Sequence, residues 1–159
     1  LGRRYDVDTA WPTSAAGSRE AAAVAAAEGY EVVAAMGGDG VAHHVANGLV
    51  HTTTALAVIP AGTTNVLARI IGLPSKPSKA ATALLNSERR AVPLVHVTDG
   101  ERSDHALFAL GIGFDAEMLR ESERRPHSKG KIGAIHNVRS AVSVSVRDYR
   151  SKPPTLKAT

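Results

Sequence analysis

Two short apolar runs in this chain each lead into a glycine-containing turn and then into a pattern typical of a helix. Residues 31–36 precede the turn at 37–40 (Gly-Gly-Asp-Gly), and residues 54–60 precede the turn at 61–65. Short apolar runs bounded by turn residues are typical of buried strands. Because strands and helices alternate with short loops, we expect a parallel sheet covered by helices on both faces, and hence an α/β fold.

Further elements and a domain boundary follow from the same kind of pattern. Additional helices are expected at residues 18–28, 41–50, 65–71, 78–86 and 132–149. Additional strands are expected at residues 1–7, 91–98 and 105–112, with a hairpin turn at 99–100 between the last two. The alternation of elements gives way to β character near residue 88. We therefore expect an α/β domain at residues 1–88 and the beginning of a β-rich second domain at 89–159.

The composition of the 159 residues excludes several classes of protein. The chain has no Cys, which removes disulfides, zinc ribbons, thiol catalysis and iron–sulfur clusters. No apolar run approaches the roughly 20 residues that a membrane-spanning helix needs. Neither a Walker A sequence nor the Gly-x-Ser-x-Gly elbow of hydrolases is present. We expect a soluble, cytoplasmic protein.

The net charge of +4 is distributed unevenly along the chain. Residues 1–118 contain 9 Lys/Arg and 12 Asp/Glu, a balance of −3, whereas residues 119–159 contain 10 Lys/Arg and 3 Asp/Glu, a balance of +7. The basic positions at 124, 125, 129 and 131 form either a solvated face or a surface for anionic lipid or phosphate. Nucleic acid fits least, because aromatic residues for stacking make up only 4% of the chain.

The two glycine-containing turns carry the features of a phosphate site. Glycines let the backbone approach a ligand closely, and a helix N-terminus offers free N–H groups and a positive dipole end. Gly62 and Thr63 add a hydroxyl donor to the second turn. Asp39 lies in the middle of the first turn, where a carboxylate repels phosphate unless it holds Mg²⁺ or orients an attacking hydroxyl. The alternative interpretation is two ordinary tight turns.

These two turns are accompanied by three further segments in a combination typical of one family. The five pieces are Gly-Gly-Asp-Gly at 37–40, Pro-Ala-Gly-Thr-Thr-Asn at 60–65, Asn-Gly-Leu at 47–49, Gly-Ile-Gly-Phe-Asp-Ala at 111–116, and Thr13 with Gly17. Together they resemble the catalytic domain of the diacylglycerol kinase family. That family includes bacterial lipid kinases and sphingosine and ceramide kinases, and NAD kinases are more distant relatives. The resemblance extends from about residue 9 to the end of the chain.

The resemblance implies a Rossmann-like nucleotide-binding domain followed by a β-rich lipid-binding domain, with the active site between them. It implies transfer of the γ-phosphoryl group of ATP, with Mg²⁺, to the hydroxyl of diacylglycerol or a related lipid alcohol. The positions carried over as nucleotide contacts are Thr13, Gly37, Gly38, Asp39, Gly40, Val41, Ala42, His43, Gly62 and Thr63. Asp39 would be the catalytic residue, either orienting metal and hydroxyl or acting as general base. The metal ligands stay unknown, and peripheral contact with the inner face of an anionic membrane is expected.

The chain departs from the family pattern at two positions and at both ends. Val41 stands where Thr is usual, and His44 stands where Glu or Gln is usual. The opening Asn-Pro-x-Ser-Gly segment and the later Asp-Gly-Glu segment of the family are not in the sequence. We therefore expect a fragment of a lipid kinase. The alternatives are a non-catalytic nucleotide-binding relic, an NAD kinase, which shares the first turn, and a basic nucleic-acid binder.

Overall fold

Two parallel strands form the sheet on which the described part of the chain is built. The computed structural model describes residues 5–98 and 100–108 of the 159 residues. Strand β1 (Val32–Gly37) pairs with β2 (Ala55–Pro60) in a register that runs from Val32 opposite Ala55 to Gly37 opposite Pro60. Both strands therefore end at the same edge of the sheet, where the two predicted turns begin.

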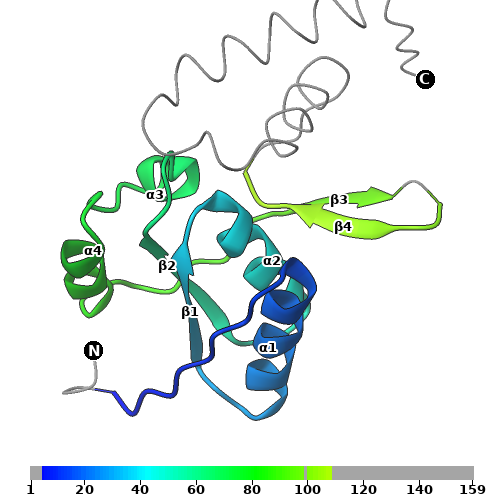
Figure 1. The fold of residues 1–159 in the computed structure, drawn as a ribbon, viewed down its shortest axis with the longest axis horizontal. Helices are drawn as coiled ribbons and strands as arrows, with labels where there is room; N and C mark the ends of the chain where they lie inside the picture. The colour runs from blue at the N-terminus through cyan, green and yellow to red at the C-terminus, as the bar shows by residue number, and fades with distance from the viewer. Residues whose placement is uncertain (1–4, 99, 109–159) are drawn as a thin grey trace, which may run out of the picture. The chain divides into compact units, whose positions relative to one another are not determined.

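Helices cover the sheet from both sides (Figure 1). Helices α1 (Ala15–Ala27) and α2 (Asp39–Leu49) lie together on one side, and α4 (Pro77–Leu84) packs against β2 on the other. The short helix α3 (Val66–Ile70) follows the second turn. These elements confirm the predicted parallel sheet and its alternation with helices. None of the helices in the described ranges is both long enough and apolar enough to cross a membrane.

The helix starts are set by local capping rather than by hydrophobic periodicity. Helix α1 begins three residues before the predicted position 18, because the Ser14 side chain accepts a hydrogen bond from the Gly17 N–H at 3.0 Å. Helix α2 begins at Asp39, inside the predicted turn, with Gly38 as its extended N-cap residue. The last two residues of the turn at 37–40 are therefore also the first residues of a helix, whose first N–H groups have no partner within the helix.

The core consists of small aliphatic side chains, which allows helices α1 and α2 to approach closely. Its buried members are Ala22, Ala35, Ala42, Val45, Leu49, Val58, Leu67 and Ala68. At Gly48 the two helices touch through the backbone, since a Cβ added there would lie 2.3 Å from the Arg19 carbonyl oxygen. The Ala-rich composition thus produces tight helix packing instead of a bulky core.

Three predictions about strands need correction. Residues 5–7 contain no strand, and the other part of that prediction, residues 1–4, lies outside the described residues. Strand β1 is not buried on both faces: Val32 and Met36 are 43% and 62% exposed, because α4 packs against β2 and leaves that face of β1 open. The hairpin strands are β3 (Val95–Thr98) and β4 (Ser103–Ala106), so the first begins four residues after the predicted position 91 and the second two residues before the predicted position 105.

The hairpin shift has a simple cause in the register. Thr98 pairs with Ser103, so the connection spans residues 99–102, longer than the two-residue turn that Asp-Gly suggests. Gly100 within it has a φ of +95°, a conformation that glycine adopts without strain.

The predicted helix at 132–149, the basic positions 124–131 and the segment 111–116 lie outside the described residues. The domain boundary near residue 88 stays a prediction.

Candidate functional site

The two predicted turns lie back to back at the carboxyl edge of the sheet. A Cβ added to Gly62 would lie 2.4 Å from the Cα of Gly38, so the two backbones are in direct contact. The Ala61 N–H donates to the Gly37 carbonyl at 2.9 Å, which continues the ladder of the two strands beyond their ends. Glycine at both positions is what permits this approach. The two turns therefore pack together as one unit.

Asn65 gives the second turn its shape. Its backbone is left-handed, with φ 48° and ψ 52°. Its Oδ1 accepts from the Gly62 N–H at 2.9 Å, and its Nδ2 donates to the Gly62 carbonyl at 2.7 Å. The side chain makes no capping bond to helix α3. Asn65 thus closes the turn on itself and holds Gly62 against Gly38.

Asp39 connects the first turn to the helix that follows the second. Its Oδ2 accepts from the Val66 N–H and its Oδ1 from the Leu67 N–H, both at 3.0 Å. A carboxylate that accepts two N–H groups at the start of a helix satisfies donors that would otherwise lack partners. Asp39 therefore takes the capping role for α3 and fixes the position of one turn against the other.

An open groove of about 350 Å³ lies between the segment before α1 and the first turns of α2. Its lining residues are Pro12, Thr13, Ser14, Ala15, Ser18, Gly40, Val41 and His44. The structure thus brings Thr13 together with Gly40 and Val41, although 27 positions separate Thr13 from Gly40 in the sequence. Hydroxyl groups and a helix N-terminus in one groove form a surface suited to an anion.

The other predicted contacts lie elsewhere. Ala42 is 2% exposed and packs in the core, and His43 faces strand β4 instead of the groove. Gly37, Gly38, Gly62 and Thr63 lie in the joined turns and are not among the residues that line the groove. Whether any of these residues contacts a nucleotide stays a prediction.

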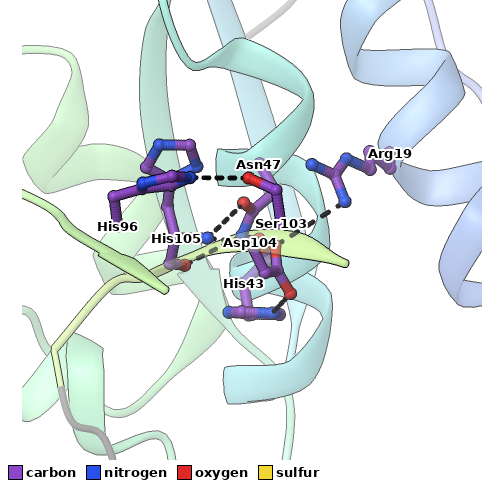
Figure 2. Close-up of polar contacts among 7 residues, drawn as sticks. All are labelled: Arg19, His43, Asn47, His96, Ser103, Asp104 and His105. Atoms are coloured by element: carbon purple, nitrogen blue, oxygen red, sulfur yellow. Dashed lines mark hydrogen bonds and ion pairs between the residues drawn. The ribbon is translucent and has the colours of Figure 1, made fainter. Parts of the chain in front are cut away.

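A polar junction joins helix α2 to the β3–β4 hairpin (Figure 2). The His43 Nε2 lies 3.0 Å from the Asp104 Oδ2, and the Arg19 Nη1 lies 3.6 Å from the Asp104 Oδ1. The Asn47 side chain donates to the His105 carbonyl at 3.0 Å and accepts from the His105 N–H at 2.8 Å. Asn47 therefore pairs with the backbone of β4 as a neighbouring strand would.

The sequence patterns did not identify Asp104 or the role of Asn47. Asn47 stood out only as part of the Asn-Gly-Leu segment of the resemblance, and it is 7% exposed in the structure. A buried amide in an otherwise apolar helix face is the signal that could have identified it, because a buried polar side chain needs partners. Asp104 carries no comparable signal, since its role depends on how the hairpin packs.

The junction has an expected acid dependence. Burial, the largest influence, acts to raise the pKa of Asp104, but the hydrogen bonds from His43 and the His105 N–H and the charges of His43 and Arg19 lower it overall. The stabilisation is therefore present above about pH 5 and is lost as pH falls through the lowered pKa. We expect less than about 1 kcal/mol, because the side chain is 45% exposed.

Urea unfolding at pH 3 and at pH 6 tests this expectation. The free energy of unfolding should fall less between these pH values in Asp104→Asn than in the unsubstituted chain. Equal losses in the two proteins would contradict the assignment.

The fold and the joined turns define an open α/β protein, a class in which ligands bind at the carboxyl ends of parallel strands. Residues 3–97 match the family model described as "Diacylglycerol kinase catalytic domain". The chain belongs to this family, and the resemblance drawn from its motifs is confirmed. Relatives in the family carry lipid kinase names.

Several named relatives share this part of the sequence. A diacylglycerol kinase of Bacillus subtilis is 36% identical over 96 residues, which cover 58% of this chain and 32% of the relative. A probable lipid kinase YegS-like of Pseudomonas putida is 38% identical over 110 residues, covering 68% and 35%. A diacylglycerol kinase of Mycobacterium tuberculosis is 42% identical over 116 residues, covering 70% and 38%. The matches span about a third of these relatives, and no solved structure gives a significant match.

Proposed function

We propose that the protein to which this chain belongs is an ATP-dependent lipid kinase acting on diacylglycerol or a related lipid alcohol. The single observation that carries the proposal is the joined pair of turns beside an anion-suited groove, in a chain that belongs to the family. The names of the relatives supply the lipid substrate class, and the described geometry supports only the phosphate end of the reaction.

The residues of the groove would bind and orient phosphate. The first N–H groups of α2 lie at Gly40 and Val41 and have no partner earlier in the helix. Thr13 and Ser14 line the same groove, and the Ser14 Oγ also accepts from the Gly17 N–H. Val41 lacks the hydroxyl that a Thr at this position would offer to phosphate, a contact worth roughly 1 kcal/mol.

Asp39 supports a positioning role in this proposal. Each of its oxygens accepts one backbone N–H group, which holds the carboxylate in one orientation and leaves a further acceptor position on each oxygen. Mg²⁺ is commonly held through one or two carboxylates together with phosphates and waters. No cluster of three His, Cys, Asp or Glu suited to a metal occurs in residues 5–98 and 100–108, so these residues do not fit a metal site of their own.

ATP binding can be measured with the chain's single tryptophan. Trp11 is 86% exposed and directly precedes Pro12 and Thr13, which line the groove. We expect a saturable change in its fluorescence on titration with Mg·ATP. The variant Gly40→Asp should weaken binding by more than about tenfold, because a carboxylate in the groove repels phosphate. It should still fold, since nothing lies within 4 Å of a Cβ at Gly40.

A matched variant separates charge at the groove from net charge. Ser75→Asp adds the same charge at an exposed loop position before α4 and should bind ATP normally. Equal affinity of Gly40→Asp and the unsubstituted chain would refute the site.

For the whole reaction, the complete gene product is incubated with labelled ATP and diacylglycerol vesicles, and labelled phosphatidic acid is expected. ATP binding without transfer to any lipid would instead support the non-catalytic alternative.

A further inference from the structure

His44 is the ionisable group of the groove. Of the eight described residues that line it, His44 is the one with a side chain that gains or loses a proton between pH 5 and 8. The remaining lining residues offer hydroxyls, backbone or apolar side chains. A proton on His44 therefore changes the charge of the groove wall itself.

The ring of His44 rests against a brace built from three elements. It meets the ring of His43 edge-on, with centroids 5.0 Å apart and planes at 74°. His43 is held at Nε2 by Asp104 of β4, and Asp104 is in turn paired with Arg19 of α1. The ring of His44 therefore packs against His43, which Figure 2 shows bonded to Asp104 of β4 beside Arg19 of α1.

We propose that His44, in its protonated form, contacts the phosphate groups of the nucleotide, so that the groove binds nucleotide more tightly as pH falls from 8 toward 6. This inference rests on the proposed nucleotide site and adds a residue and a regulation to it. A protonated His44 would give the described groove a positive charge that none of its other lining side chains supplies.

The charged groups that the printed contacts place behind His43, the ring against which His44 packs, act in both directions. Asp104 on β4 favours positive charge there, whereas Arg19 on α1 and a protonated His43 oppose it. The lining positions of the segment 12–18 have no titratable side chain. A bound phosphate adds negative charge, so the complex takes up a proton and affinity rises toward low pH. We expect affinity to change by about tenfold across the transition, as for one added hydrogen bond to a charged group.

The test compares ATP affinities from pH 5.5 to 8.5 by Trp11 fluorescence, using the full chain. Because ATP itself titrates in this range, the informative quantity is the ratio of affinities between the chain and His44→Gln at each pH. We expect a ratio of about tenfold near pH 5.5 that falls toward one at pH 8.5. His51→Gln is the matched control, since it removes an imidazole just beyond the other end of α2 and should follow the unsubstituted chain.

A second variant keeps the test decisive if Gln disturbs folding. His44→Lys carries a permanent positive charge. We expect the ratio of its ATP affinity to that of His44→Gln to change with pH by less than threefold. If His44→Gln unfolds, His44→Asn replaces it in this ratio. A constant ratio near one between the chain and His44→Gln overturns the inference while ATP binding itself upholds the nucleotide site. A folded chain that binds no ATP at any pH overturns both.

Discussion

Replacing Gly62 by Ala is expected to separate the two turns and destabilise the domain. The added Cβ would lie 2.4 Å from the Gly38 Cα and 3.0 Å from its N atom, and both are backbone atoms that cannot turn aside. Relief requires a shift of one turn against the other. That shift would strain the bonds from Asp39 to the start of α3 and from Asn65 to residue 62. We expect the free energy of unfolding to fall by about 3 kcal/mol, at the upper end of overpacking effects.

Gly38→Ala provides the matched control for this substitution. A Cβ at Gly38 would lie 3.4 Å from the Gly62 Cα, an ordinary contact, although the same two residues face each other. Its unfolding free energy in urea should stay within about 1 kcal/mol of the original, as is usual for changes without a clash. If the two variants lose stability equally, the turns do not pack as the structure has them. The same samples titrated with ATP should show binding lost in Gly62→Ala.

The meeting of these turns could be predicted from the sequence, because two parallel strands place their carboxyl ends at one edge. The partners of Asp39 could not. Its carboxylate looked like a catalytic or metal-binding group in the sequence, yet its two bonds depend on where α3 begins, 27 residues further along the chain. Local pattern carries no information about such a distance.

The β3–β4 hairpin is a second case in which the sequence predicted the element but not its partners. Its β character and its glycine turn were visible in the sequence, whereas its register depended on a longer connection than Asp-Gly implies. Asn47 and Asp104 attach it to α2 and α1 through side chains that no periodicity identifies. The exposure of one face of β1 could likewise not be predicted from its apolar residues, because it depends on the packing of α4 against β2.

Gly48→Ala is the second substitution with a large expected effect, and here two influences compete. Within a helix, Ala is preferred to Gly by about 1 kcal/mol, so propensity alone predicts stabilisation. At Gly48, however, the Cβ would lie 2.3 Å from the Arg19 carbonyl oxygen and 2.8 Å from the Ala22 Cβ. Helices α1 and α2 would have to move apart over their whole contact. Overpacking costs of about 3 kcal/mol exceed the propensity gain, and we expect a net loss of about 2 kcal/mol.

Gly40→Ala in the same helix isolates the propensity influence. Nothing lies within 4 Å of its Cβ, so this variant should be as stable as the original or up to about 1 kcal/mol more stable. Thermal unfolding followed by circular dichroism should therefore move in opposite directions for the two variants. Opposite signs for one chemical change in one helix would attribute the loss at Gly48 to the contact with α1. Stabilisation at both positions would mean that the two helices do not approach as closely as the structure shows, and the brace behind His44, which uses Arg19 of α1, would lose its support.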